Sequence, residues 1–361
     1  MRPRDILSEV LGLRAWDETS SHTARLGLVG GPGQPKFAVP LGWRRATWSS
    51  CTSYPGLRDR GTRLRRRAAG VSLMVTSRRP VVSERLCAEE GEGSLIALLS
   101  SLLDTADFGI AVGLGGGDEL WKPTLQLFTP EGAPLAFVKV AHTDLTAHLV
   151  RTEGEALDVW SRVAAPALLV PTLVANTLWR ERPLLVVAPL PVDSRRAADA
   201  SVDATPVRAL DPPLGDVPLE DSTWWRARRA VPVEPAVRDV LDEVERRQAG
   251  VPRSWARWHG DWVPWNVARS AGRLVAWDWE YSEAGAPVGL DEVHRTYQMV
   301  RFGRQRPVRE ALAAVRVTVS SSWLVDAHKA MLVSRAATLA AVNGRPVTDH
   351  EEVLDGVAAS W

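Results

Sequence analysis

The alternation of apolar and polar residues divides the chain into a strand-rich middle part and a helix-rich second half. From residue 108 to residue 188, short apolar runs are separated by connectors that contain many turn-forming residues, which is typical of β-strands. The connectors between the first three runs contain Gly115-Gly-Gly-Asp-Glu119 and Thr129-Pro-Glu-Gly-Ala133, which are rich in turn-forming residues, so antiparallel hairpins are the simplest arrangement. The runs that predict strands are Phe108–Leu114, Pro123–Phe128, Leu135–Val140, Thr172–Leu178 and Leu184–Ala188.

Helical periodicity is clearest at Pro235–Gln248, where a proline stands at the start and Gly250 follows the end. Apolar residues recur there at the i, i+3, i+4, i+7 spacing of one helix face: Val237, Val240, Leu241 and Val244. From Gly289 onward the pattern is also helical. The other segments that we expect to be helices are Leu95–Leu103, about Thr146–Val163, Val308–Val317 and Ser321–Val342.

The first 95 residues give a weaker pattern. They contain one strand-like run, Lys36–Pro40, and a basic stretch, Arg58–Arg67, in which Asp59 is the only acid. Residues 192–222 are polar and rich in proline, alanine and aspartate, so we expect little regular structure there. The chain is therefore expected to be an α+β protein with two lobes. Its parts would be an N-terminal extension of unknown role (1–95), a small antiparallel-sheet lobe with one helix (96–190) and a mainly helical lobe (191–361).

Composition narrows the class of protein without naming a function. The chain has 361 residues, 45% of them hydrophobic and 24% charged, which is typical of a soluble globular protein. A net charge of +1 gives no reason to expect nucleic acid as a partner, and no apolar run is long enough for membrane insertion. Two cysteines cannot form a disulfide framework, and the N-terminal residues lack a secretory core, so we expect a cytoplasmic protein.

Two neighbouring segments carry the candidate chemistry. The first is Trp258–Asn266 and the second is Leu274–Tyr281; Asp261 lies five positions before Asn266, and Asp278 lies twelve positions after it. Phosphoryl transfer needs a carboxylate to orient the attacking hydroxyl and oxygen ligands to hold Mg²⁺. An aspartate, an asparagine and a second aspartate in this order supply those groups.

These segments resemble the catalytic-loop and metal-site motifs of the aminoglycoside phosphotransferase and choline kinase family, over about residues 105–300. The resemblance rests on His259-Gly-Asp261 followed by Asn266, and on Asp278-Trp-Glu-Tyr. It implies a bilobal protein-kinase-like fold that uses ATP and Mg²⁺. Asp261 would be the catalytic base, and Asn266 and Asp278 would be the magnesium ligands. The Trp279 that follows Asp278, in place of Phe-Gly, argues against a regulated protein kinase.

The same resemblance implies supporting roles for three further residues of the second half. His259 would brace the catalytic loop, and Asp291 would buttress that loop from the following helix. Glu280 would assist either the metal or the acceptor.

The resemblance also implies a nucleotide site in the strand-rich part. Lys139 is the one lysine in an apolar strand-like run, and it would hold the α and β phosphates while pairing with a helix glutamate. Glu153 is the expected partner, with Glu155 as the alternative. The glycines Gly115, Gly116 and Gly117 would cover the phosphates, and backbone groups of Ala188 and Leu190 would meet the base.

The acceptor stays open, with an aminoglycoside, a sugar and an amino alcohol as the expected types. Four tryptophans are candidates for an aromatic acceptor wall, although helix packing is the simpler interpretation for the first two: Trp224, Trp225, Trp262 and Trp265. Two alternative functions also remain. One is a catalytically weak, pseudokinase-like nucleotide-binding scaffold, and the other is a nucleic-acid or membrane-surface module that uses Arg58–Arg67.

Overall fold

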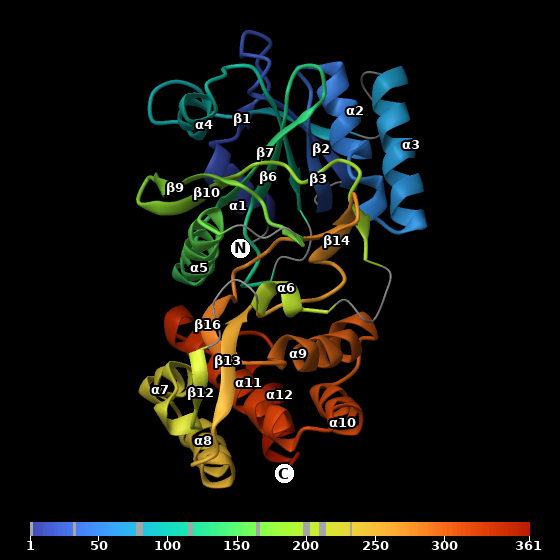
Figure 1. Cartoon of the computed structure of the whole chain (residues 1–361). Coiled ribbons are helices and arrows are strands. Elements are labelled where there is room, and N and C mark those ends of the chain that lie inside the picture. The colour runs from blue at the N-terminus through green and yellow to red at the C-terminus, as the bar shows by residue number, and fades with distance from the viewer. Residues whose placement is uncertain are drawn as a thin grey trace. The chain divides into compact units, whose positions relative to one another are not determined.

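The computed structural model describes residues 3–31, 34–76, 82–114, 118–163, 167–197, 203–208, 214–231 and 233–361. The chain folds into two compact units (Figure 1). Unit 1 consists of Met1–Leu157, Pro171–Arg196 and Ala268–Val275, and unit 2 consists of Asp158–Val170, Ala197–Val267 and Ala276–Trp361. Within the described residues, none of the helices combines the length and apolarity needed to cross a membrane.

Unit 1 is built on one nine-stranded antiparallel sheet with the order β1-β4-β2-β3-β5-β6-β7-β10-β9. The antiparallel hairpins expected from the sequence are confirmed. The first 95 residues extend this same sheet, because β3 pairs with β5. The strands are β1 (Arg14–Ala15), β2 (Arg25–Gly31), β3 (Gln34–Pro40), β4 (Val82–Cys87), β5 (Gly109–Gly113), β6 (Thr124–Phe128), β7 (Pro134–Val140), β9 (Leu173–Trp179) and β10 (Arg182–Val187).

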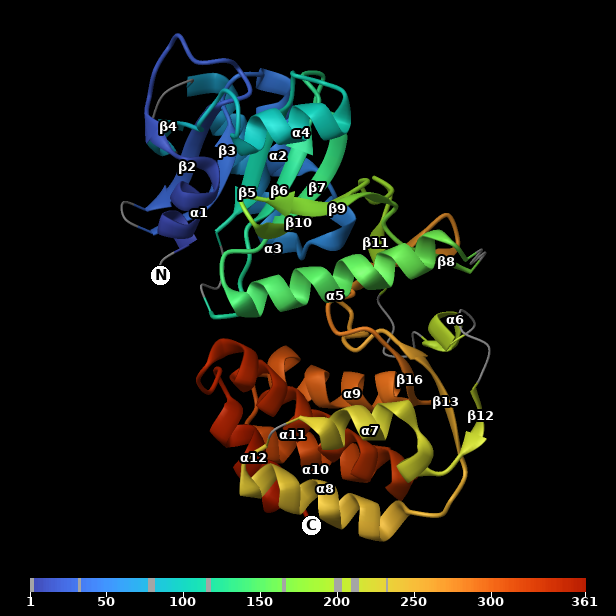
Figure 2. The same cartoon turned by 90° about the vertical axis from the view of Figure 1, so that its left-hand side faces the viewer.

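The two faces of this sheet differ because successive residues of a strand point to opposite sides. On β7, Ala136, Val138 and Val140 are fully buried in the core, whereas Phe137 and Lys139 are only half-buried on the other face. Helices α1 and α4 contribute apolar residues to that core, and α2 contacts β3, β5 and β6. The helices are α1 (Pro3–Leu11), α2 (Arg44–Thr52), the short η1 (Pro55–Leu57), α3 (Arg60–Thr76), α4 (Leu95–Leu103) and α5 (Asp144–Ser161), which Figure 2 shows along its length.

Unit 2 is mainly helical and has its own core. Residues Val237, Val240, Leu241 and Val244 are all buried, which confirms the predicted inner face of α8. A three-stranded sheet, β12-β13-β16, packs beside the helices. The elements are β8 (Leu168–Leu169), α6 (Thr205–Arg208), β12 (Leu214–Val217), η2 (Leu219–Asp221), α7 (Thr223–Ala230), α8 (Pro235–Gln248), β13 (Arg253–Trp258), β16 (Glu283–Pro287), α9 (Leu290–Gln298), η3 (Met299–Gly303), α10 (Val308–Thr318), α11 (Ser322–Asn343) and α12 (His350–Ala358).

The segment 192–222 is more structured than the sequence suggested. Its described parts include β11 (Arg195–Arg196), α6 and β12. In their respective sheets, β11 pairs with β14 (Val267–Ser270), which is followed by β15 (Arg273–Ala276), and β12 pairs with β13. The partners of both strands are distant in sequence, and a local pattern does not contain that information.

Candidate active site

The backbone of the loop that precedes Asp261 is held by a buried carboxylate. Asp291, in the first turn of α9, accepts hydrogen bonds from the backbone N–H of His259 (2.9 Å) and of Gly260 (3.0 Å). Burial raises the pKa of Asp291 to about 7, while the two N–H donors act in the opposite direction. One side chain therefore fixes two successive peptide groups of the loop.

The turn at this loop can be made only by glycine. Gly260 has a φ of 83°, in the left-handed region, and a Cβ added there would lie 2.2 Å from the carbonyl oxygen of Tyr281. That oxygen belongs to the backbone and cannot rotate away. The glycine of the His-Gly-Asp motif is thus required by both conformation and space.

His259 is a structural brace. Its side chain is fully buried, Nδ1 accepts a hydrogen bond from the backbone N–H of Asp261 (3.2 Å), and Nε2 lies 3.1 Å from the carbonyl oxygen of Trp277. This pairing requires the proton on Nε2, which donates to that carbonyl. The ring also packs between Trp262 and Trp279. Both ring nitrogens form hydrogen bonds with the backbone, and these bonds hold the loop in one orientation.

Asp261 is oriented by two amide groups. Nδ2 of Asn266 donates to Oδ2 of Asp261 (2.8 Å) and to its carbonyl oxygen (3.2 Å), and Nε2 of Gln298 donates to Oδ1 (3.3 Å). Burial raises the pKa of Asp261 to about 7, with the negative charge of Asp278 as the next cause and the charge of Arg335 opposing it. A carboxylate with this pKa can exchange a proton near neutral pH.

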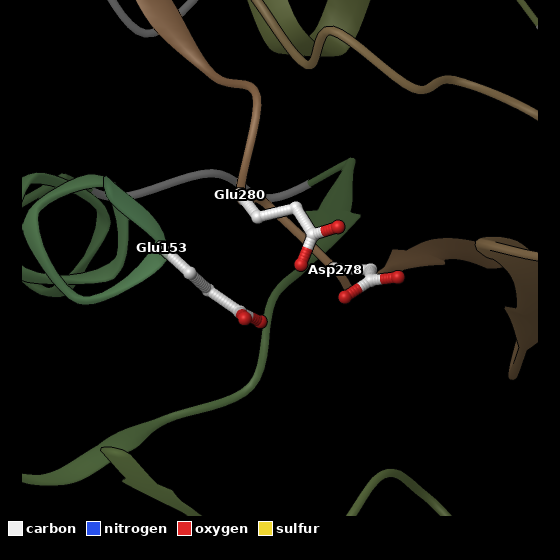
Figure 3. A group of neighbouring side chains, drawn as sticks. All are labelled: Glu153, Asp278 and Glu280. Atoms are coloured by element: carbon white, nitrogen blue, oxygen red, sulfur yellow. The ribbon is translucent and has the colours of Figure 1, made fainter. Parts of the chain in front are cut away.

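The possible metal ligands in unit 2 are all oxygens. Asp278 and Glu280 follow β15, and Figure 3 draws both of them there, as well as Glu153 on α5. A carboxylate oxygen of Asp278 lies within 4.8 Å of one of Glu280. Because Nδ2 of Asn266 donates a hydrogen bond to Asp261, the amide oxygen of Asn266 is the atom of this side chain that can bind a cation. A set of one amide and two carboxylate oxygens fits a hard cation such as Mg²⁺.

A polar network behind Asp261 was missed by the sequence reasoning. Nε2 of Gln298 contacts Nε2 of His294 (3.1 Å), whose Nδ1 lies 3.1 Å from Nε2 of His328. Arg335 contacts Nε2 of His294 (3.3 Å) and donates to the carbonyl oxygen of Gly260 (3.2 Å). One signal was present in the sequence: His294 and Gln298 are four positions apart on α9, and His328 and Arg335 are seven apart on α11, so each pair shares a helix face.

In unit 1, Lys139 forms an ion pair with Glu153. Nζ lies 2.5 Å from Oε2, and the side chains are 13% and 3% exposed. Glu155, the alternative partner, is exposed on α5. The pair is formed between β7 and the helix that follows it, and the roles of both residues in nucleotide binding stay predictions.

Of the two residues whose backbone is expected to meet a base, each has one backbone group with a partner in unit 1. The N–H of Ala188 donates to the carbonyl oxygen of Thr172 (2.8 Å), and the carbonyl oxygen of Leu190 accepts a hydrogen bond from the hydroxyl of Tyr54 (3.0 Å). The ring of Tyr54 lies against Phe137, with 5.9 Å between the centroids. The glycines 115–117 lie outside the described residues, so the predicted phosphate loop stays a prediction.

Three of the four tryptophans suggested for an acceptor wall are core residues. Trp224, Trp225 and Trp262 are at most 2% exposed, because the first two lie on the inner face of α7 and the third packs on His259. Trp265 is half-buried. Helix packing, the simpler interpretation, is therefore confirmed for Trp224 and Trp225, and a place in an aromatic wall is wrong for Trp262 as well.

No protein-family model and no curated protein matches the sequence, but similarities exist among solved structures. Aminoglycoside phosphotransferase APH(4)-Ia is 12% identical, with a TM-score of 0.47, over 73% of this chain and 96% of that chain. The macrolide 2′-phosphotransferase MphH from Brachybacterium faecium is 15% identical, with a TM-score of 0.35, over 69% and 90%. Amicoumacin kinase hAmiN, in complex with AMP-PNP, Ca²⁺ and Ami, is 10% identical, with a TM-score of 0.38, over 65% and 85%. Similarity at this level assigns no function, which has to rest on the geometry of the site.

Proposed function

We propose that this protein is an ATP-dependent phosphotransferase with a protein-kinase-like fold, and that it moves the γ-phosphate of ATP to a hydroxyl group of a small molecule. One observation carries the proposal: the carboxylate of Asp261 is held by Asn266 on a loop whose backbone is fixed by Asp291. Phosphoryl transfer requires little covalent chemistry from the protein, so precise positioning of the reacting groups and stabilisation of charge are the main requirements.

In this proposal, Asp261 accepts the proton of the attacking hydroxyl. Its pKa of about 7 gives it enough basicity for that task while leaving it largely ionised above neutral pH. His259 and Gln298 keep the carboxylate in place and do not touch the substrate. The acceptor would be an aminoglycoside, a sugar or an amino alcohol.

Asn266, Asp278 and Glu280 would hold the divalent cation. When bound, the cation would neutralise charge on the phosphate oxygens. Asp278 adopts a left-handed backbone with a φ of 70°, a conformation that aspartate tolerates better than most residues.

Unit 1 would supply the contact to the nucleotide phosphates through Lys139. An ammonium group that is largely buried needs a counter-charge, and Glu153 supplies it while holding the lysine in one direction. A lysine paired with a helix glutamate is the arrangement expected where the lysine positions the phosphates of a nucleotide.

The central experiment compares Asp261→Asn with Asp216→Asn. Both changes remove one carboxylate from unit 2, but Asp216 is exposed and accepts a hydrogen bond only from the Ser254 hydroxyl among the described residues. With ATP, Mg²⁺ and a panel of aminoglycosides, sugars and amino alcohols, Asp261→Asn should lower kcat by about a hundredfold or more and leave nucleotide affinity largely intact. Equal turnover by the two variants would remove the assigned role of Asp261.

A second experiment tests the lysine. Lys139→Met should weaken ATP binding by about tenfold or more, because a charged contact to the phosphates is lost. Lys36→Met is the matched control, since Lys36 is an exposed lysine on β3 of the same sheet. If both variants bound ATP as the unmodified protein does, Lys139 would have no part in nucleotide binding.

A second candidate function is a nucleotide-binding scaffold with weak or no turnover. The observation that favours it is the hydrogen bond from Tyr54 to the carbonyl oxygen of Leu190, a residue whose backbone the resemblance assigns to the base. This candidate predicts nucleotide binding without ADP formation for every acceptor in the panel. ADP formation that depends on Asp261 would exclude it.

A further inference from the structure

Two of the arginines in the basic stretch 58–67 differ from the others. Arg58 and Arg66 are half-buried, whereas Arg60, Arg63, Arg65 and Arg67 are exposed. The exposed members form the solvated side of α3, as expected for a charged surface helix. The positions of Arg58 and Arg66 are unusual, because charged groups are rarely withdrawn from water without a compensating contact.

Both side chains line a cavity of about 230 Å³ in unit 1. Its floor is the sheet face that carries Lys139, since Gln126 pairs directly with Phe137 and Thr124 pairs with Lys139 itself. Its other side is formed by the α2–α3 pair, which Figure 1 shows next to β3. The lining residues are Phe37, Ala38, Ser50, Arg58, Arg66, Ala111, Val112, Gly113, Thr124, Gln126 and Phe137.

The cavity has positive charge and no negative charge of its own. Its lining includes two arginines and no aspartate or glutamate. Among the described residues, Nη1 of Arg58 donates to the carbonyl oxygen of Cys51 (2.9 Å), Nη1 of Arg66 donates to that of Ser50 (3.4 Å), and no carboxylate pairs with either. Burial lowers the pKa of Arg58 to about 10, and the charge of Arg66 acts in the same direction. The two carbonyl contacts orient the guanidinium groups and leave other N–H donors of each for a ligand.

A neutral donor and two aromatic rings complete the cavity. Nε2 of Gln126 is buried and has no hydrogen-bond partner in the described part of the chain. The Arg66 guanidinium lies 4.9 Å from the centroid of the Phe37 ring, and Phe137 lies on the floor. A buried amide donor without a hydrogen-bond partner costs free energy, and so do two buried cations without a counter-charge. A bound oxyanion would accept hydrogen bonds from all three groups and neutralise the two positive charges.

We propose that this cavity binds a phosphate group, either free or as a small phosphate ester. Two guanidinium groups without a counter-charge match a phosphate, which carries a charge of about −1.5 to −2 near neutral pH, better than they match a monoanionic carboxylate. The aromatic walls provide room and apolar surface for the organic part of an ester. The site depends on Arg58 and Arg66, which belong to the first 95 positions and have no part in the phosphotransferase function proposed above.

The test measures binding of inorganic phosphate, phenyl phosphate and benzoate to the full-length protein by calorimetry. Arg58→Gln/Arg66→Gln should weaken phosphate and phenyl phosphate binding by about tenfold or more, because two charged hydrogen-bonding groups are lost. Arg63→Gln/Arg67→Gln removes the same charge from exposed positions of the same helix and should change affinity by less than about twofold. Equal affinities of the two double variants would overturn the proposal, as would benzoate binding as tightly as phenyl phosphate.

Two further measurements distinguish phosphate binding in this cavity from phosphate binding elsewhere on the protein. Lys139→Met tests the neighbouring lysine: loss of phosphate binding in this variant, together with unchanged binding in Arg58→Gln/Arg66→Gln, would place the phosphate at the lysine and overturn the proposal. Phosphate should raise the Tm of the unmodified protein and of Arg63→Gln/Arg67→Gln, but not that of Arg58→Gln/Arg66→Gln. A rise of the same size in all three would contradict the site. Tighter binding of phenyl phosphate than of inorganic phosphate would support an ester as the ligand, and equal binding would support phosphate itself.

Discussion

Replacing Gly260 by alanine tests whether the loop before Asp261 is as constrained as its contacts indicate. The residue has a φ of 83°, which costs an alanine roughly 1–2 kcal/mol relative to glycine. The new Cβ would also lie 2.2 Å from the carbonyl oxygen of Tyr281, and relieving that contact requires a backbone shift. Overpacking of this kind costs about a further 1–3 kcal/mol.

Gly344→Ala separates the two contributions. Gly344 also lies in unit 2, has a φ of 71° at the end of α11, and a Cβ there would have no atom within 4 Å. This variant should show only the conformational cost of roughly 1–2 kcal/mol. The difference between the two variants, about 1–3 kcal/mol, measures the contact with Tyr281.

Urea unfolding followed by tryptophan fluorescence is a suitable assay, because most of the tryptophans lie in unit 2. Under the proposed function, Gly260→Ala should also lower kcat by about a hundredfold, since a shift of about 1 Å misplaces Asp261. Gly344→Ala should keep normal turnover. Equal destabilisation by the two substitutions, with unchanged activity, would refute the reasoning about this loop.

Three further outcomes follow from two of the hydrogen bonds described above and from the burial of two histidines. Tyr54→Phe removes the donor to the connector after β10, so ATP should bind about fivefold more tightly in a calorimetric titration if the base uses that carbonyl. Gln298→Leu removes a donor to Asp261 and should lower kcat about tenfold in steady-state kinetics, with the KM for ATP unchanged. Burial lowers the pKa of His328 to about 3 and that of His294 far below its usual value. Between about pH 3 and 6.5 these histidines are therefore protonated in the unfolded state and neutral in the folded state. The folded protein should lose stability as the pH falls through that range. His328→Gln should reduce this loss by about 2 kcal/mol at pH 5, measured as urea unfolding at pH 7 and pH 5.

The sequence predicted those elements whose signal is local. The α8 face repeats at helical spacing, and the hairpins of β5, β6 and β7 follow each other with turn residues between them. It did not predict β13, in which Arg253, Ser254 and Arg257 interrupt the apolar pattern and whose partner β16 lies about thirty residues later. Strand pairing over such a distance depends on the tertiary fold, and a local pattern does not determine it.

In the candidate site, too, contacts between residues close in sequence were predicted and contacts between distant residues were not. Asp261 and Asn266 lie close in sequence, and the loop between them brings their side chains together. Helical geometry also decided the partner of Lys139: Glu153 and Glu155 are two positions apart, about 200° around α5, so one is buried and the other faces solvent. Gln298 lies 37 positions after Asp261, and only the packing of α9 brings it to that carboxylate.

Several departures from ordinary local structure in unit 2 lie around the loop that carries Asp261. Asp278 has a left-handed backbone, Gly260 packs against a carbonyl oxygen, and Asp261 has its pKa raised in part by the nearby charge of Asp278. Each of these features costs stability, and a fold selected for stability alone would avoid them. The buried carboxylate of Asp291 and the ring of His259 hold the same loop against those costs. Strain that is opposed by dedicated supports is the pattern expected where chemistry requires two carboxylates close together, and it favours a catalytic role for this loop over a purely structural one.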